Sequence, residues 1–511
     1  MDYSSNPPVT KLLTATNSEI VNYDSIVLLS APSQKLPEFV APVVNEAKKY
    51  DQAFESEVSV VPLLKSSQRL IYYPIGSFDP DYDDVRKFKE GSAKAIKRAL
   101  KAGSRKPLLL LNDHPRFEKA ALVTLLGVLE ALYTPIQVRE HDASKANKVD
   151  HLGIWSETSD SNILANLATI IESGRRVACD IGDADPERMS PPRIEEYIRK
   201  IFANSSIKLS TVSDLKEFSK DYPLFEAVNR AAHQNERHRG RIVYLEYNPP
   251  ETPRETIFLV GKGVTYDTGG ANVKVGGGML GMSRDKCGAA AAVGFMRVVD
   301  LLRPKHLKVV VGVGLVRNSI GSNSYVPDEV ITARSGARVR VINTDAEGRM
   351  IMADILCKFK EQALEEINPH LYTIATLTGH AWLTVGDGYS IVIDNGPAYK
   401  TGHCFSLQKA GDIIGDPFEI STLRREDISS HKGKMEGDDV VQGGDKPSAQ
   451  TPRGHQNPAA FLLLASGLDK YGSDSQKPLK YSHLDIAASA GSFPDPATGS
   501  PVLALVQKYL L

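Results

Sequence analysis

The stretch VRVINTDAEGRMIMAD, residues Val339–Asp354, is the part of the sequence that determines the fold. Its β-branched first half favours a strand, and a helix is expected over Ala346–Gln362. Two acids, Asp345 and Glu347, stand two positions apart in the turn, so their side chains can converge on one side of it. Open α/β sheets build their sites at the carboxyl ends of strands. The stretch therefore predicts an α/β fold with a site at this turn.

Strands and helices also alternate on both sides of this stretch. We expect an α/β fold of two domains, each with a mostly parallel or mixed sheet flanked by helices. The predicted strands are Ser25–Ser30, Val58–Leu64, Arg69–Ile75, Leu108–Leu111, Ile242–Tyr247, Thr256–Val260, Leu307–Val316 and Leu371–Leu377. The predicted helices are Asp83–Ala102, Phe117–Tyr133, Asn162–Arg175, Arg193–Phe202, Gly288–Leu302 and Ala346–Gln362.

Two domains are expected because 511 residues exceed the size of one ordinary core. The polar, proline-bearing passage Gly182–Pro192 punctuates the chain, and we place the boundary near residue 185. Residues 1–185 would form an N-terminal α/β domain for oligomerisation or regulation, since they carry no catalytic constellation. Residues 186–511 would form the catalytic domain.

The charge balance, the start of the chain and the cysteines lead us to expect a cytoplasmic protein. Sixty-one basic side chains nearly balance 62 acidic ones, which gives no support for binding nucleic acid or a membrane surface. The start, Met1–Pro8, lacks a signal-peptide pattern, and the longest apolar runs are far shorter than a membrane span. Four scattered cysteines are typical of reduced, mostly buried thiols: Cys179, Cys287, Cys357 and Cys404.

Two further segments add candidate side chains to the acidic turn. The segment LVGKGVTYDTGG has Lys262 and Asp267 just past a predicted strand. The segment NVKVGGGMLGMSRDKCGAAAA has Lys274, and then Asp285 immediately before an alanine-rich helix. Each acid alone is more often a helix cap or a solvated side chain than a ligand. Together with the acidic pair of the turn, they favour one site.

Four of these side chains can hold metal. Asp267, Asp285, Asp345 and Glu347 supply four negative charges, which would balance two divalent cations. Without cations, four clustered carboxylates would repel one another. Oxygen ligands suit hard or borderline ions such as Zn, Mn, Co or Mg, and two metals about 3.5–4 Å apart form a recurrent hydrolytic device.

These segments resemble those of the leucyl (cytosol) aminopeptidase family of dinuclear zinc metallopeptidases. NTDAEGR, the signature of that family, is matched in full by Asn343–Arg349, and VGKG-x-T-x-D-x-GG by Val260–Gly270. The similarity continues through Ile320–Gly336, Ala375–Gly379 and His483–Ala487. The resemblance implies a metal-dependent aminopeptidase, zinc as the metal, and a homohexamer built as a dimer of trimers.

The resemblance also implies a ligand set. One metal would be held by Lys262, Asp267, Asp285 and Glu347, and the other by Asp267, Asp345 and Glu347. A lysine ligand must be a neutral amine, and bringing its pKa from about 10.4 to below 7 costs about 4.6 kcal/mol. Two nearby divalent cations could offset that cost.

The implied mechanism uses a water or hydroxide between the metals to attack the first peptide carbonyl. One metal also binds the free α-amine of the peptide, which restricts cleavage to the first residue. Lys274 would donate to the developing oxyanion. Arg349 would hold a bicarbonate ion as general base; judged from residue type alone, it could equally form a salt bridge to a site carboxylate.

The pocket for the first side chain is less well specified. The resemblance assigns it to Met282, Thr376, Leu377 and Gly379, which could equally be ordinary core and turn residues. Two regions depart from the family, the stretch His380-Ala-Trp382 and the polar loop Lys432–Asn457. Both should border the cleft, and they leave the preferred first residue open.

Two alternative functions remain at this point. The same site could serve a dipeptidase of narrow specificity, for example one for cysteinylglycine. The chain could also be a binding or scaffold protein with a vestigial site, although its complete set of ligands argues against this.

Overall fold

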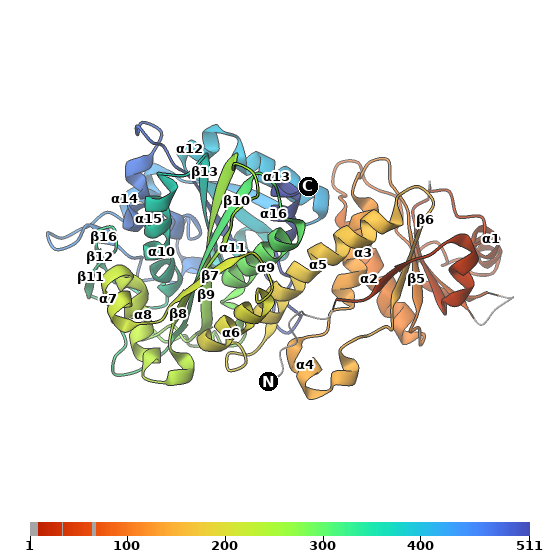
Figure 1. The fold of residues 1–511 in the computed structure, drawn as a ribbon, viewed down its shortest axis with the longest axis horizontal. Coiled ribbons are helices and arrows are strands. Elements are labelled where there is room, and N and C mark those ends of the chain that lie inside the picture. Colours follow the sequence, from red (N-terminus) through yellow and green to blue (C-terminus); the bar gives the residue numbers. More distant parts are fainter. Residues whose placement is uncertain (1–8, 33, 64–67) are drawn as a thin grey trace. The chain divides into compact units, whose positions relative to one another are not determined.

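The computed structural model describes residues 9–32, 34–63 and 68–511. The prediction about a signal peptide concerns Met1–Pro8, which lie outside the described residues. The chain forms two compact units. One contains the described residues from 9 to 173 together with Asp412–Gly415, and the other contains Gly174–Gly411 and Asp416–Leu511. The division falls inside helix α5, Ser161–Asp183 (Figure 1).

The first unit is built on a six-stranded sheet of order β1-β6-β5-β2-β4-β3. All neighbouring strands are parallel except β3 and β4. The strands are β1 (Leu12–Thr14), β2 (Ser25–Ser30), β3 (Ser59–Pro62), β4 (Arg69–Pro74), β5 (Pro107–Leu111) and β6 (Leu152–Ser156). The helices are η1 (Asn17–Asn22), α1 (Ala41–Tyr50), α2 (Arg86–Lys101), α3 (Ala120–Ala131), α4 (Ile136–His141) and η2 (Ala143–Lys145).

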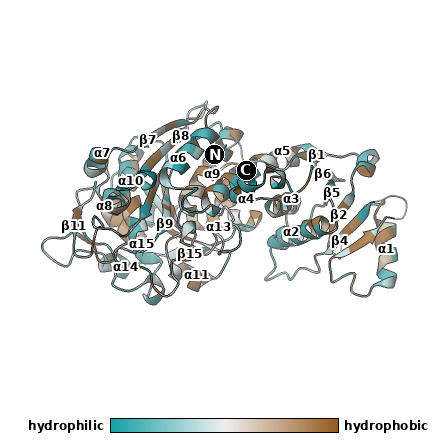
Figure 2. Cartoon of the chain, turned by 90° about the horizontal axis from the view of Figure 1, so that it is seen from below, coloured by the Kyte–Doolittle hydropathy of each residue, from teal (hydrophilic) through white to brown (hydrophobic). Residues whose placement is uncertain are grey.

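Helix α2 shows how the sequence pattern forms this layer. Its apolar positions Phe88, Ala95, Ile96 and Ala99 are buried, and the helix packs on α3, β2 and β4. Its lysines Lys94, Lys97 and Lys101 are exposed. In Figure 2, β2 and β4 carry brown hydrophobic residues and α2 is largely teal. The helical spacing of the sequence therefore matches the buried face.

The second unit is built on an eight-stranded mixed sheet of order β15-β14-β17-β13-β9-β10-β8-β7. Its central strands β17, β13, β9 and β10 are parallel. The strands are β7 (Lys208–Val212), β8 (Arg241–Tyr247), β9 (Glu255–Asp267), β10 (Leu307–Asn318), β13 (Pro369–Ala375), β14 (Ser390–Asp394), β15 (Phe418–Thr422) and β17 (Lys480–Asp485). A small three-stranded sheet holds β11 (Val330–Thr332), β12 (Arg338–Arg340) and β16 (Val440–Val441).

Helices cover both faces of this sheet, with α9 (Cys287–Leu302) and α10 (Glu347–Ala363) on opposite sides of β9 and β10 (Figure 1). Glycines allow the close approach: a Cβ on Gly261 would lie 2.6 Å from Ala289 Cα of α9. The other α-helices are α6 (Pro191–Ile201), α7 (Leu215–Asp221), α8 (Pro223–His233), α11 (Gly379–Val385), α12 (Gly396–Lys400), α13 (His403–Ile414), α14 (Arg425–Ser430), α15 (Gln456–Ser466) and α16 (Val502–Tyr509). The 3-10 helices are η3 (Glu236–His238), η4 (Met282–Arg284), η5 (Ser448–Gln450) and η6 (Leu468–Tyr471).

The structure confirms the predicted α/β class, with a large sheet in each unit, and corrects several bounds. Strand β9 continues to Asp267, so Lys262 lies inside the strand and not past it. The reason is tertiary: β9 pairs with β10 as far as Asp267↔Asn318, which extends it through a glycine-bearing stretch. Helix α5 runs to Asp183, beyond the predicted end at Arg175. The predicted strand Val58–Leu64 is shorter, Ser59–Pro62, and Leu64 itself lies outside the described residues.

The polar loop 432–457 also contains more structure than predicted. Val440–Val441 pair with β12, η5 covers Ser448–Gln450, and α15 already begins at Gln456. The four cysteines are buried, as expected for most of them. In the part of the chain that the structure describes, no helix is both long enough and apolar enough to cross a membrane.

Candidate active site

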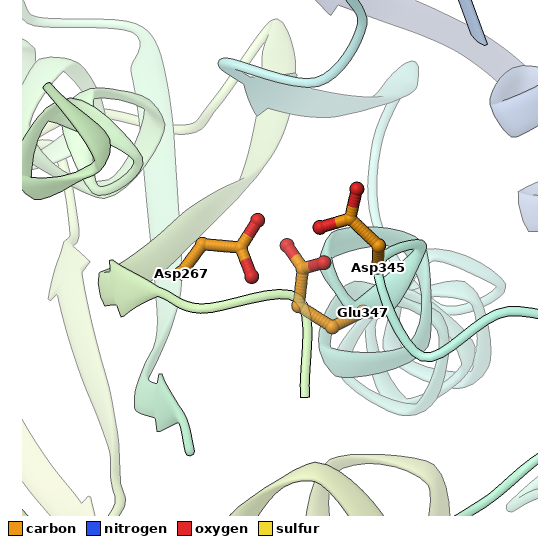
Figure 3. Close-up of side chains that lie close together, drawn as sticks. All are labelled: Asp267, Asp345 and Glu347. Atoms are coloured by element: carbon orange, nitrogen blue, oxygen red, sulfur yellow. The ribbon is translucent and has the colours of Figure 1, made fainter. Parts of the chain in front are cut away.

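The candidate side chains converge at the carboxyl end of β9. Asp267 is the last residue of β9, Glu347 is the first residue of α10, and Asp345 lies in the turn just before it. Figure 3 shows these three carboxylates pointing toward one another from the strand and from the helix turn. One oxygen of each lies within 4.8 Å of the others. The structure therefore brings together residues that are far apart in sequence.

Lys262 joins Asp285 to this cluster. Its Nζ lies 2.6 Å from Asp285 Oδ1 and 3.0 Å from Glu347 Oε1, and it donates to the Thr376 carbonyl at 2.9 Å. Burial lowers the pKa of Lys262, but the charges of the surrounding carboxylates outweigh burial and hold its pKa above the ordinary value. The amine that the resemblance assigns to metal is thus a cation between two acids here.

Lys274 contacts the other two acids of the cluster, Asp267 and Asp345. Its Nζ lies 2.9 Å from Asp267 Oδ2 and 2.5 Å from Asp345 Oδ1. Burial again lowers its pKa, and the two carboxylates raise the pKa above its usual range. Each lysine therefore contacts two of the four acids, and the two lysines together offset half of the four negative charges.

Three of the acids, Asp285, Asp345 and Glu347, have raised pKa values. Burial, with the neighbouring charges of Asp267 and Glu347, raises the pKa of Asp345 to about 7. Burial also raises the pKa of Asp285 and of Glu347. These carboxylates hold their protons more tightly than free acids do, because four of them share a buried site. Cations would restore their charged form.

The donor set fits divalent cations. Asp285 Oδ2 and Glu347 Oε2 are buried and have no hydrogen-bond partner among the described residues. A buried carboxylate oxygen without a partner is costly, and a cation would satisfy it. Oxygen donors converging from the end of β9, the end of η4 and the start of α10 suit Zn, Mn, Co or Mg.

Asn318, which the sequence analysis did not select, orients Asp267. Its Nδ2 donates to Asp267 Oδ1 at 2.8 Å and to the Thr344 carbonyl at 3.1 Å. Asn318 ends β10 directly opposite Asp267 in the strand register. Only that register could have identified it, because the side chain stands 51 positions away in sequence.

Gln442 is a second residue that the sequence analysis missed. Its Oε1 accepts from the backbone N–H groups of Ile342 and Asn343 at 3.0 Å each, and its Nε2 donates to the Ala346 carbonyl at 3.1 Å. Its own carbonyl accepts from Arg349 at 3.0 Å. This fully buried side chain therefore clamps both sides of the acidic turn.

Arg349 contacts the same glutamine, because its Nη1 donates to the Gln442 backbone carbonyl. Burial lowers the pKa of Arg349 to about 10, which leaves it a cation at neutral pH. Within the described residues it forms no ion pair with a site carboxylate, so the salt bridge considered from residue type is not found. Its Nε is buried without a hydrogen-bond partner among those residues.

A cavity of about 560 Å³ opens over the site. All seven candidate metal and catalytic residues line it, and so do the four candidate pocket residues: Lys262, Asp267, Lys274, Asp285, Asp345, Glu347, Arg349, Met282, Thr376, Leu377 and Gly379. Trp382 and parts of the loop between Gly443 and Asn457 complete the wall, as the sequence predicted. His380 is not a lining residue; its Nδ1 lies 2.8 Å from His455 Nδ1.

Asp485 holds the wall that carries the candidate pocket residues. Its Oδ2 accepts from the Thr378 hydroxyl at 2.7 Å, and its Oδ1 accepts from the Leu377 and Ala487 N–H groups at 3.3 and 3.1 Å. Burial raises its pKa to about 6. The segment His483–Ala487 thus supports the cavity wall through Asp485.

Comparison with solved structures identifies this fold. Trypanosoma brucei leucyl aminopeptidase in complex with bestatin matches with a TM-score of 0.81 at 20% identity, covering 99% of this chain and 96% of that one. The bottromycin maturation enzyme BotP in complex with Mn matches with a TM-score of 0.76 at 20% identity, covering 95% and 98%. At this identity the likeness concerns the fold alone.

Comparison of sequences identifies the family. The model of the cytosol aminopeptidase family, catalytic domain, matches residues 176–506. A Caenorhabditis elegans protein named as an aminopeptidase is 43% identical over 518 residues, 98% of each chain. A Campylobacter jejuni protein named as a cytosol aminopeptidase is 34% identical over 357 residues, 70% of this chain and 66% of that one. This chain therefore belongs to the cytosol aminopeptidase family and is a metal-dependent aminopeptidase, a hydrolase that removes the first residue of peptides.

Proposed function

We propose that the converging carboxylates form a centre for two divalent ions. Lys262, Asp267, Asp285 and Glu347 would hold one ion, and Asp267, Asp345 and Glu347 the other. The observation that carries this proposal is the pair of buried, unpartnered oxygens, Asp285 Oδ2 and Glu347 Oε2, beside carboxylates within ligand distance of one another. Such ions, when bound, lower the pKa of a water and polarise the peptide carbonyl.

Lys262 must lose a proton to act as a ligand. Its Nζ already lies against Asp285 and Glu347, so the amine needs no change of partners to face an ion held by those acids. Ion binding would then release a proton, as it does at other sites with protonated ligands.

Lys274 stands where a charge on the substrate can be stabilised. It lies between Asp267 and Asp345 and lines the cavity, so its N–H groups can donate to the carbonyl oxygen as negative charge develops there. Arg349 would hold bicarbonate as the general base, because its buried Nε is a charged donor without a partner among the described residues.

A general aminopeptidase fits the cavity better than a dipeptidase specific for cysteinylglycine. About 560 Å³ lies within the range of about 300–1,000 Å³ for small-molecule sites. The cavity extends from the carboxylates to Trp382 and Phe493, which leaves room for larger first side chains. The scaffold alternative does not apply to a peptide hydrolase with this complete site.

Metal analysis and mutation test the centre. The purified chain, stripped with a chelator and reloaded with Zn, Mn, Co or Mg, should bind two ions per chain and regain peptide hydrolysis. Asp345→Ala and Glu347→Ala should each lose at least one ion and most activity. Glu365→Ala, which removes an acid 84% exposed, is the control and should retain both. Full activity and two ions in both site variants would refute the assignment.

The assembly and location are further parts of the proposal. We expect a homohexamer, a dimer of trimers, with residues 1–185 serving assembly or regulation. All residues that line the cavity come from the segment between Lys262 and Phe493, which supports a separate role for the first part of the chain. A relative from Wolinella succinogenes carries the name cytosol aminopeptidase, which supports a cytoplasmic location. Native mass spectrometry and fractionation test these points.

A further inference from the structure

An apolar rim stands at the cavity, outside the charged centre. Leu280, Trp382 and Phe493 line the cavity and keep 74%, 47% and 54% of their surface exposed. Single exposed apolar side chains are common, but three on the wall of one cavity form a surface that can bind an apolar group.

The indole of Trp382 is fixed by a carboxylate. Its Nε1 donates to Asp387 Oδ1 at 2.7 Å. The hydroxyl of Ser492 donates to the same oxygen at 3.1 Å. Asp387 therefore ties the indole of α11 to the segment that carries Phe493.

The turn around Asp387 is built by two glycines. Gly386 and Gly388 have φ values of 76° and 88°, which favour glycine. The Gly386 N–H donates to the Trp382 carbonyl at 2.9 Å, and the Gly388 N–H donates to the Ala488 carbonyl at 2.8 Å. The backbone thus brings Asp387 back against Trp382, and a rigid aromatic side chain costs little entropy when a ligand binds.

The rim flanks the candidate pocket for the first side chain. Gly379 and Trp382 are three positions apart on α11 and share one face of the helix. On the other side, a Cβ on Gly281 would lie 3.3 Å from Phe493 Cβ, directly beside Met282. The aromatic rings therefore extend a pocket that begins at Gly379 and Met282.

We propose that Trp382 is a specificity-determining residue, whose indole, held by Asp387, packs against an aromatic side chain at the first position of the peptide. This rests on the proposed assignment of the centre and of the pocket. Aromatic pairs gain from offset-stacked or edge-to-face contact beyond the area that they bury. Alanine or cysteine at the first position offers little such area. Asp387 acts through the indole and is a positioning residue.

The test compares kcat/KM of the full-length, metal-loaded enzyme for Phe-Gly-amide, Ala-Gly-amide and Ala-Phe-amide. Trp382→Ala should lower kcat/KM for Phe-Gly-amide about tenfold, the size expected for a lost aromatic contact, and leave Ala-Gly-amide within about twofold. Trp382→Phe should retain most of the preference. Asp387→Ala should lose part of it, and Asp387→Asn, which keeps an acceptor, should recover it.

Leu383→Ala is the matched control, since Leu383 is 58% exposed on the same helix and does not line the cavity. It should leave all three substrates unchanged. An equal loss on all substrates in Trp382→Ala, or a loss confined to Ala-Phe-amide, would overturn the inference. A wild-type enzyme inactive on all three would instead refute the proposed centre, and the inference with it.

Discussion

Replacing Gln442 by alanine tests whether the clamp on the acidic turn positions the metal ligands. The change removes three side-chain hydrogen bonds, to Ile342 N–H, Asn343 N–H and the Ala346 carbonyl. At about 1 kcal/mol net for each bond, the variant should lose about 3 kcal/mol of unfolding free energy. Because the turn carries Asp345 and Glu347, metal affinity should also fall, by about 10–100-fold, as for other residues that support ligands.

Two assays separate these effects. Urea unfolding of the metal-loaded protein reports the loss of stability, and competition with a chelator reports metal affinity. Gln408→Ala is the matched control, since its Nε2 donates to the Phe418 carbonyl at 2.8 Å, outside the set of cavity-lining residues. The control should lose stability and keep metal affinity. If Gln442→Ala keeps wild-type metal affinity, or if both variants lose it equally, the clamp has no specific role at the site.

Two further predictions concern the lysines and the acids. Lys274→Ala should lower kcat by about 10²–10³ with little change in metal affinity, because it removes an oxyanion donor. Steady-state kinetics check this, with Lys446→Ala of the cavity wall as the control. An effect on KM alone would contradict the prediction. Metal affinity should fall as pH falls, because protons on Asp345, whose pKa is raised to about 7, and on Lys262, whose pKa is also raised, compete with the ions. The expected slope near pH 7 is about tenfold per pH unit for each proton displaced, measured by chelator competition between pH 6 and 8; a flat profile would exclude the competition.

Local patterns predicted much of the fold. Strand β2 has the predicted bounds, Ser25–Ser30, because a short run of β-branched and leucine residues is buried on both faces. Helix α10 begins one residue after the predicted start, where the acidic turn ends. Asp267 and Thr376 line one cavity because the parallel strands β9 and β13 end at the same edge of the main sheet. Asp345 and Glu347 reach this cavity from the turn before α10, which follows β12 of the small three-stranded sheet and not a strand of the main sheet.

Contacts between distant segments determined the rest. Gln442 stands 100 positions from Ile342, and Asn318 stands 51 positions from Asp267, so no local pattern marks either of them. The sequence marked Trp382 only as a departure from the family. The structure shows that the Gly386–Gly388 turn places Asp387 against its indole.

The sequence by itself determined the chemistry of this protein, because the residue types and spacing of the acidic turn and of the β9 segment specify which groups can hold metal and polarise a carbonyl. Only the tertiary structure decided which side chains orient those groups and form the pocket. Hydrogen bonding and burial depend on distance in space, and the pairing of β9 with β10 and of β12 with β16 sets those distances.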